Sequence, residues 1–368
     1  MKNKIIFISS FILLLSLFSC KPSASYRLFV GGFAKPGERG MHVFDFNEKN
    51  GKVTAISDAD VGPNPSYFCY SSKNQLIYVA NEVMEFNGRF GGGISTFRYK
   101  AEDATFEKLN EMLIPYGGPC FISISPDSGY LYLASYPNGS ISVVRLGSSG
   151  IPESITDTIL YRKDEPDASH AHMIMNDLSG DKIYVTDLGQ NMIFRYSFNR
   201  NIGVLSPIDT LRVPDKFGPR HFVFSRDGSK LYVINELGSK ITVFSISDSP
   251  QLIQIISTVR EDFNTDNYCA DIHLSNDGRF IYGSNRGENT IVTFEVKADG
   301  TLSLAGHTSC DGNWPRNFTL DPSGKFLLAG NQKSDSVAVF KINDSNGIPS
   351  FTGEKFKVTA PACLKFYF

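Results

Sequence analysis

The 368-residue sequence lacks the patterns of a helical, nucleic-acid-binding or multidomain protein. Beyond its first twenty residues, no stretch carries a sustained apolar repeat of 3.6 residues, so amphipathic helices are not expected. No low-complexity segment or interdomain linker interrupts the chain. Lys and Arg number 36 against 38 Asp and Glu, and there is no basic run, which argues against a nucleic-acid surface. These absences indicate a single domain that is built from β-strands.

Cysteine is also scarce. One of the six cysteines lies near the N-terminus, and the other five form no Cys-x-x-Cys pair. Several occupy strand positions that suit a small apolar residue, so we expect buried free thiols; a structural disulfide is the alternative in an exported protein. No spacing of His, Asp or Glu resembles a metal site, and no cofactor ligands are found. The five cysteines are Cys69, Cys120, Cys269, Cys310 and Cys363.

The N-terminus has the order of an export signal. Residues 1–4 are basic, residues 5–18 are apolar, and Leu-Phe-Ser-Cys follows at 17–20. The apolar run is too short for a membrane-spanning helix, and its ending resembles a bacterial lipobox. We predict a lipoprotein signal peptide over 1–19, an acylated Cys20 and a tether over 20–25. An ordinary cleaved signal peptide is the alternative. The protein is then exported, held on a bacterial membrane by its lipid only, and faces the periplasm.

One phrase recurs seven times in the rest of the chain. Each copy is a short alternating strand, a polar turn with glycine, and a second strand; residues 219–235, 270–285 and 315–331 show it most plainly. The residue before each turn recurs every 46 to 54 residues. A repeat of that length made only of strands is typical of a β-propeller with one four-stranded sheet per repeat. These turn positions are Ser71, Ser125, Asp177, Ser225, Ser275, Asp321 and Tyr367.

The two ends of the repeat array complement each other. The array opens on a second-strand phrase at 28–32 and closes on a lone first-strand phrase at 361–368. We therefore predict that the C-terminal strand completes the first blade, which leaves no open sheet edge. The predicted fold is all-β: a seven-bladed propeller over residues 26–368 with four-stranded antiparallel blades.

The repeat also predicts where a site would lie. In an antiparallel blade, the start of the first strand and the end of the second strand meet at one rim of the central channel. Six polar residues are expected at this rim. At the starts of first strands these are His172, Arg220 and Arg316, and at the ends of second strands they are Glu236, Arg286 and Gln332. Charged groups that converge on a channel indicate a ligand site, although rim residues can also serve only to solvate the channel. The recurring strand-end asparagines, including Asn235 and Asn285, also suit a turn where a strand stops.

The rim motifs, taken in order, resemble the seven-bladed propeller lactonase family. They lie at residues 167–172, 187–189, 218–222, 235–237, 285–287 and 315–318. This family includes 6-phosphogluconolactonases and carboxy-cis,cis-muconate cyclases. The resemblance implies catalytic roles for His172, Arg220, Glu236 and Arg286, and no metal or other cofactor. We assign His170, Arg316, Asn235, Asn285 and Gln332 to substrate binding.

The expected activity is therefore hydrolysis of a sugar lactone, with a small lactone or sugar acid as the ligand. His172 or Glu236 would activate water, and an arginine would stabilise the oxyanion. Two alternatives stay open: a propeller that binds a ligand or partner without catalysis, and a lactone-forming cyclase. Export fits poorly with a cytoplasmic phosphorylated lactone. Strand alternation predicts that His221 points away from Arg220, and Glu82 occupies the position equivalent to Glu236.

Overall fold

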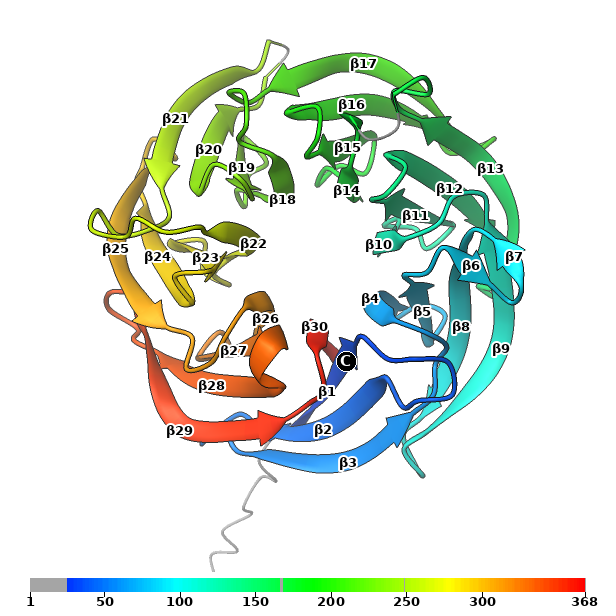
Figure 1. Cartoon of the computed structure of the whole chain (residues 1–368), viewed down its shortest axis with the longest axis horizontal. Helices are drawn as coiled ribbons and strands as arrows, with labels where there is room; N and C mark the ends of the chain where they lie inside the picture. The colour runs from blue at the N-terminus through cyan, green and yellow to red at the C-terminus, as the bar shows by residue number, and fades with distance from the viewer. Residues whose placement is uncertain (1–24, 166–167, 248, 368) are drawn as a thin grey trace, which may run out of the picture.

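Seven antiparallel sheets of four strands stand around a central axis in the computed structural model, which describes residues 25–165, 168–247 and 249–367 (Figure 1). The predicted seven-bladed propeller is confirmed. The predicted signal peptide and Cys20 lie outside the described residues. Within those residues, no helix is long and apolar enough to cross a membrane.

The first four blades each place one strand at the axis and three further out. Blade 1 comprises β30 (Pro361–Tyr367), β1 (Ser25–Gly32), β2 (Met41–Asn47) and β3 (Val53–Ala59). Blade 2 comprises β4 (Pro65–Ser71), β5 (Leu76–Asn81), β8 (Gly92–Lys100) and β9 (Thr105–Ile114). Blade 3 comprises β10 (Pro119–Ile124), β11 (Tyr130–Ser135), β12 (Ser140–Leu146) and β13 (Pro152–Leu160). Blade 4 comprises β14 (Ala171–Asn176), β15 (Lys182–Asp187), β16 (Met192–Asn199) and β17 (Val204–Arg212).

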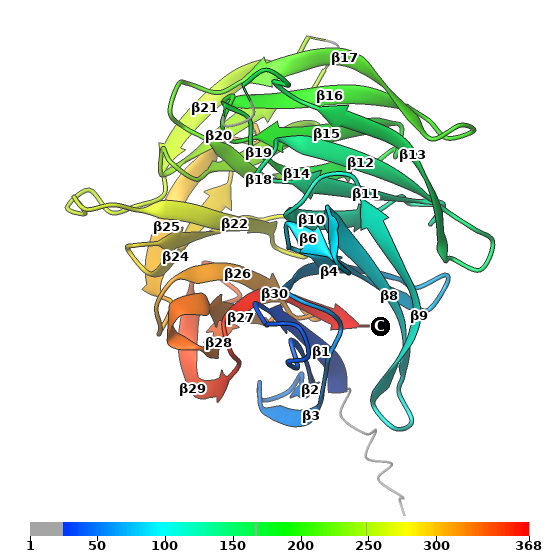
Figure 2. The same cartoon turned by 45° about the vertical axis from the view of Figure 1, so that its right-hand side comes forward.

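The remaining three blades repeat the same order. Blade 5 comprises β18 (Pro219–Phe224), β19 (Lys230–Asn235), β20 (Lys240–Ser245) and β21 (Gln251–Ser257). Blade 6 comprises β22 (Tyr268–Leu274), β23 (Phe280–Arg286), β24 (Thr290–Val296) and β25 (Leu302–Ser309). Blade 7 comprises β26 (Pro315–Leu320), β27 (Phe326–Asn331), β28 (Ser336–Ile342) and β29 (Pro349–Lys357). A hairpin of β6 (Glu85–Phe86) and β7 (Arg89–Phe90) extends blade 2, and η2 (Gln332–Ser334) follows β27. Figure 2 shows the outer strands curving around the blades.

The ring closes within blade 1, as predicted. The C-terminal strand β30 pairs antiparallel with β1, from Arg27 opposite Tyr367 to Gly32 opposite Pro361. The two strands come from opposite ends of the chain and lie side by side in Figure 1. This closing strand covers the inner edge of β1, which would otherwise invite pairing with another chain.

The residue before each inner turn explains why the repeat is so regular. The hydroxyl of Ser225 accepts a hydrogen bond from the Lys230 amide at 2.9 Å, and Ser275 and Asp321 close their turns in the same way. The turn then needs a left-handed residue, and Gly228 has φ +71°. Glycine adopts this conformation without strain, which is why the turn phrase contains it.

The core lies between adjacent blades. The central tyrosine of the second-strand phrase is fully buried in five blades, as Tyr78, Tyr132, Tyr184, Tyr232 and Tyr282. Three of these donate hydrogen bonds to the next blade: Tyr78 to Gly150 O at 2.7 Å, Tyr232 to Gly300 O and Tyr282 to Gly347 O at 3.0 Å. A buried hydroxyl needs such a partner, so the repeated tyrosine both fills the interface and ties neighbouring blades together.

The five cysteines of the described residues are all buried and free, which confirms the expectation of unpaired thiols. Burial raises the pKa of Cys69, Cys269 and Cys310 to about 12. Because the thiolate is the reactive form, these thiols behave as small apolar core residues.

Candidate active site

The inner strand of every blade is interrupted at the same place, and this interruption builds the rim. In blade 5 the pairing of β18 with β19 jumps from Pro219 to His221 and leaves Arg220 unpaired. Such a β-bulge bends the strand and re-aims the extra side chain. Three of the unpaired residues, His172, Arg220 and Arg316, are predicted rim residues. The full set is Ser66, Cys120, His172, Arg220, Ala270, Arg316 and Ala362, with Asp271 also unpaired in blade 6. The bulge therefore turns one side chain per blade toward the axis.

A carboxylate held by two guanidinium groups forms the centre of this rim. Glu236, directly after β19, places Oε2 2.9 Å from Nε of Arg220 and 2.9 Å from Nη2 of Arg286. The arginine side chains are only 3% and 5% exposed, whereas that of Glu236 is 16% exposed. Removing one member of such a buried cluster leaves an unpaired charge, so the three residues act as a unit.

Backbone carbonyls fix both arginines in place. Arg286 donates from Nε to Tyr268 O and from Nη2 to Cys269 O, each at 3.1 Å. Arg220 donates from Nη1 to Ala270 O. Burial lowers the pKa of Arg286 to about 10, and Glu236 opposes that shift. Burial also lowers the pKa of Arg220, and Glu236 again opposes the shift. Both guanidinium groups are thus held in place beside a carboxylate, an arrangement that suits the stabilisation of developing negative charge.

His172 lies beside this cluster as a buried, neutral imidazole. Burial, reinforced by Arg220, lowers its pKa well below the ordinary value. Its Nδ1 has no hydrogen-bond partner among the described residues. The ring lines a small cavity together with Arg220 and Arg316, with room for about one water molecule. A neutral imidazole that lines such a space and has an unpartnered nitrogen can accept a proton from water.

His170 faces a different part of the rim. Its ring stacks on Tyr136 with centroids 4.5 Å apart, and its Nδ1 lies 3.1 Å from Tyr136 O. Tyr136 also contacts the His172 ring edge-to-face at 5.7 Å, so it joins the two histidines. His170 lines a cleft of about 380 Å³ with Tyr136, Leu188, Gly189, Asn191, Lys216 and Leu237. This cleft adjoins the Glu236 cluster through Leu237 and is large enough for a monosaccharide ring.

Arg316 stands on the other side of the channel with Glu82. Its Nη2 is 3.9 Å from Oε2 of Glu82, and its guanidinium lies 5.1 Å from the centroid of the Phe33 ring. The Arg316 guanidinium and the Glu82 carboxylate are close but do not form a hydrogen bond, since Oε2 of Glu82 accepts none from a described residue. The motifs did not single out Glu82, although its place after the Asn81 strand end is equivalent to that of Glu236. That equivalence was the available signal for its presence at the rim.

The other three predicted substrate-binding residues have more local contacts. Asn235 and Asn285 are fully buried. The Asn235 amide donates to Val233 O and Lys240 O, and the Asn285 amide donates to Thr258 O at 2.7 Å. These contacts match the strand-end role that the sequence left open. Gln332 starts η2, and its backbone amide donates to Trp314 O at 3.0 Å.

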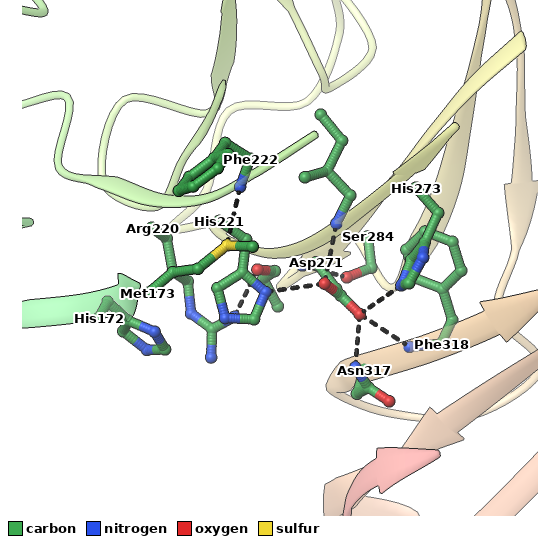
Figure 3. Close-up of polar contacts among 12 residues, drawn as sticks. His172, Met173, Arg220, His221, Phe222, Asp271, His273, Ser284, Asn317 and Phe318 are labelled. Atoms are coloured by element: carbon green, nitrogen blue, oxygen red, sulfur yellow. Dashed lines mark hydrogen bonds and ion pairs between the residues drawn. The ribbon is translucent and has the colours of Figure 1, made fainter. Parts of the chain in front are cut away.

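A polar network below the rim was not foreseen (Figure 3). The carboxylate of Asp271 accepts hydrogen bonds from His221 Nδ1 at 2.8 Å, from His273 Nε2 at 3.0 Å and from the Asn317 amide. Burial alone would raise the pKa of Asp271, but His273 and His221 hold it well below its usual range. Burial, with Arg220 nearby, lowers the pKa of His221 to about 4. Because a neutral His221 donates from Nδ1 to the ionised Asp271, its proton lies on Nδ1.

This network corrects one sequence prediction. His221 is buried and hydrogen-bonded, but it does not point away from Arg220 as predicted: its Nε2 lies 3.4 Å from Arg220 Nη1. The bulge between Pro219 and His221 breaks the strict alternation on which the prediction depended. Asp271 therefore contacts His221, and His221 in turn contacts Arg220 of the Glu236 cluster.

The described residues contain no group of three or more His, Cys, Asp or Glu side chains that could hold a metal ion. The candidate chemistry consists of a buried neutral imidazole, a carboxylate between two guanidinium groups, and a third guanidinium across the channel. This set can bind an oxyanion, polarise a carbonyl and accept a proton.

The fold and this rim define a class of protein: propellers that present a charged site on one face of the ring. Residues 27–366 match the family model described as lactonase, 7-bladed beta-propeller, and the chain belongs to that family. It is 32% identical to a 6-phosphogluconolactonase of Formosa agariphila, covering 92% of this chain and 99% of the relative. It is 25% identical to a 6-phosphogluconolactonase of Bacillus subtilis, at 92% and 97% coverage. The periplasmic gluconolactonase of Pseudomonas aeruginosa superposes with a TM-score of 0.87 at 28% identity, over 93% of this chain and 99% of that one.

Proposed function

We propose that this protein hydrolyses a sugar lactone at the rim formed by His172, Arg220, Glu236 and Arg286. The observation that carries the proposal is the buried His172 imidazole, neutral and with an unpartnered Nδ1, in a water-sized cavity that it shares with Arg220. A general base and an oxyanion-binding cation beside one water are the two requirements of ester hydrolysis.

The proposed reaction begins when His172 takes a proton from water as the water oxygen bonds to the lactone carbonyl carbon. The carbonyl oxygen becomes an oxyanion, which Arg220 or Arg316 stabilises from the cavity wall. The ring C–O bond then breaks, and the leaving alkoxide takes the proton from His172. We assign the base role to His172 because the Glu236 carboxylate is already held by two arginines through Oε2. Glu236 keeps those arginines in position.

The preferred substrate is a gluconolactone-type sugar lactone. Curated relatives carry the name 6-phosphogluconolactonase, and a structural neighbour is called a periplasmic gluconolactonase. The predicted export of this chain favours an unphosphorylated lactone, and the cleft beside His170 accommodates its hydroxyl groups. Arg316 remains available for an anionic group, so a phosphorylated or acidic lactone is the variant to compare.

The test is acid release from glucono-δ-lactone and 6-phosphogluconolactone by residues 26–368, corrected for spontaneous hydrolysis. Loss of the base in His172→Gln should lower kcat about 10²- to 10⁴-fold. Glu236→Gln should lower kcat/KM about 100-fold or more, because both arginines lose their partner. Glu295→Gln, an exposed carboxylate paired with Lys297, is the matched control and should retain full activity.

Absence of turnover in the wild-type protein would reject the lactonase and favour a ligand-binding propeller. Formation of a lactone from an acyclic acid, without hydrolysis, would favour the cyclase alternative. Full activity in His172→Gln would remove the proposed base while leaving the family assignment intact.

We also propose that Cys20 anchors the exported protein to a bacterial membrane through lipid. The basis is the residue order of the N-terminal signal, which lies outside the described structure. Membrane fractionation of the full chain and of Cys20→Ser tests it. The wild type should sediment with membranes and Cys20→Ser should not; equal partitioning of both would contradict the anchor.

A further inference from the structure

A second cavity occupies the opposite end of the channel from the Glu236 cluster. Its volume is about 560 Å³, within the range of about 300–1,000 Å³ typical of small-molecule sites. The inner strands run from the rim toward this end, and their far halves supply the walls. Apolar residues dominate these walls, among them Phe121, Met173, Met175, Val223 and Phe224.

A single layer of rings separates this cavity from the proposed active site. Tyr67 and His221 line both spaces. The Tyr67 ring stacks on Phe121 with centroids 4.3 Å apart, and both rings meet the edge of His221. Figure 3 shows His221 of this layer beside its hydrogen-bond partner Asp271. A molecule in the lower cavity therefore would not reach Glu236 directly, and the two ends of the channel are separate sites.

The lower cavity contains one cation without a counter-ion. Lys365, on the closing strand β30, lines the cavity and places Nζ 4.9 Å from the centroid of the Tyr67 ring. No carboxylate of the described residues lies within 4 Å of this ammonium group. A half-buried charge against apolar walls is unfavourable unless it meets an opposite charge.

The nearby acid cannot supply that charge. Oδ1 of Asp271 accepts from His221 and the Ile272 amide, and Oδ2 accepts from His273 and Asn317. Its lone pairs are therefore committed to the wall. Asp177 at the far mouth is engaged in its own turn, where Oδ1 accepts from Ser179 at 2.8 Å. The unpaired positive charge of Lys365 attracts one negative charge, and the negative charge of Asp177 at the mouth repels a second. The cavity therefore favours a monoanion over a dianion.

We propose that this cavity binds a small aryl carboxylate, with its carboxylate on Lys365 and its ring among the phenylalanine and methionine side chains. Aromatic rings suit these walls because Phe edges and Met sulfur both make favourable contacts with a ring. Such a ligand is chemically unlike a hydroxyl-rich sugar lactone, so this site is distinct in both place and specificity from the one at the rim.

Calorimetric titration of 3-phenylpropionate and 3-phenylpropan-1-ol compares an anion with a neutral molecule of the same shape. The wild type should bind the carboxylate at least tenfold more tightly than the alcohol. Lys365→Met keeps the stem and removes the charge, so it should abolish the preference, whereas Lys365→Arg should retain it. Arg316→Met, at the upper site, is the matched control and should leave the preference unchanged. Equal affinities, no binding, a preference that survives in Lys365→Met, or one lost in Arg316→Met would each overturn the proposal.

A second measurement decides the matter even if Lys365→Met does not fold. In crystals of the wild-type protein soaked with 3-(4-bromophenyl)propionate, the anomalous signal of bromine should lie beside Met175 and Val223, with the carboxylate on Lys365. Bromine at the rim, on the surface or nowhere would overturn the proposal.

Discussion

At the residue scale, the proposed chemistry depends on histidines that burial keeps neutral. Desolvation and the charge of Arg220 both disfavour the imidazolium form of His172 and of His221. The two rings are in contact, edge-to-face at 5.1 Å, so protonation of either would add a further positive charge to a site already rich in arginine. Their neutrality is a consequence of position, not of residue type.

The lowered pKa of His172 has a consequence for the pH–rate profile. A histidine with the ordinary pKa of about 6.5 would lose base activity tenfold per pH unit below that value. Because the pKa of His172 lies well below 6.5, we expect kcat/KM to stay level from about pH 8 down to pH 6. Initial rates over this range, corrected for spontaneous hydrolysis, provide the check. An acid limb centred near pH 6.5 would contradict a buried neutral base.

His221 should also make stability depend on pH. As pH falls from 6.5 toward 4, the unfolded chain binds a proton that the folded His221 refuses, so the free energy of unfolding decreases. A shift from about 6.5 to about 4 corresponds to about 3 kcal/mol at the low end of that range. Urea denaturation between pH 7 and pH 4 measures the loss, which should be smaller in His221→Gln. The control is His307→Gln, and a loss equally reduced there would refute the assignment.

At the element scale, the β-bulge is the device that makes a site from a repeat. Seven inner strands carry an extra residue at the same position, and the side chain of that residue meets the axis. Three of the seven residues are Arg or His, and all three line the small cavity at the rim. Blade 6 differs because Asp271 is also released from pairing, and it supports the neighbouring blade through His221.

We therefore expect Asp271 to act as a positioning residue for Arg220. Asp271→Asn removes the negative charge that fixes the His221 proton on Nδ1, so we expect kcat to fall roughly tenfold with little change in KM, and stability to fall by about 1–3 kcal/mol. The ¹⁵N shifts of His221 should show the Nδ1–H tautomer in the wild type and lose it in the variant. Asp209→Asn, which breaks a pair with Arg195, is the control. It should lose stability without losing kcat; equal kcat in both variants would exclude the positioning role.

At the scale of the whole molecule, the closing strand holds the ring together and also serves the lower cavity. β30 pairs with β1 and packs against β26 and β4, so it joins blades 1, 2 and 7. Lys365 is carried on the same strand. Ring closure and the proposed anion site therefore depend on the same seven residues.

Deletion of residues 361–368 should open blade 1 and expose the edge of β1. We expect the truncated protein to lose cooperative thermal unfolding and to aggregate, as an unpaired edge promotes. Because Arg27 lies opposite Tyr367, the same strand placed before Ser25 with a short glycine-containing turn can refill its position. Light scattering and thermal melts should show rescue in that permuted chain. A monomeric, cooperatively folding deletion would refute the role of closure.

The sequence by itself determined the architecture. The recurring phrase of strand, polar turn and strand sets blade number, and the unmatched phrases at the two ends set closure. Both are local patterns, since alternation and turn chemistry depend on near neighbours in the chain. The same register also predicted which residues lie at the rim, because equivalent residues of a repeat occupy equivalent places around the axis. These residues are His172, Arg220, Glu236, Arg286 and Arg316.

Only the tertiary structure decided how these residues meet. The bulge that turns Arg220 toward the axis also turns His221 beneath it, and alternation along a regular strand predicts the opposite. Asp271 joins His221 from the next blade, fifty residues further along the chain. The pairing of Glu82 with Arg316 and the isolation of Lys365 likewise depend on distances between blades. Contacts across the channel arise from packing of seven separate sheets, and no pattern within a single repeat encodes them.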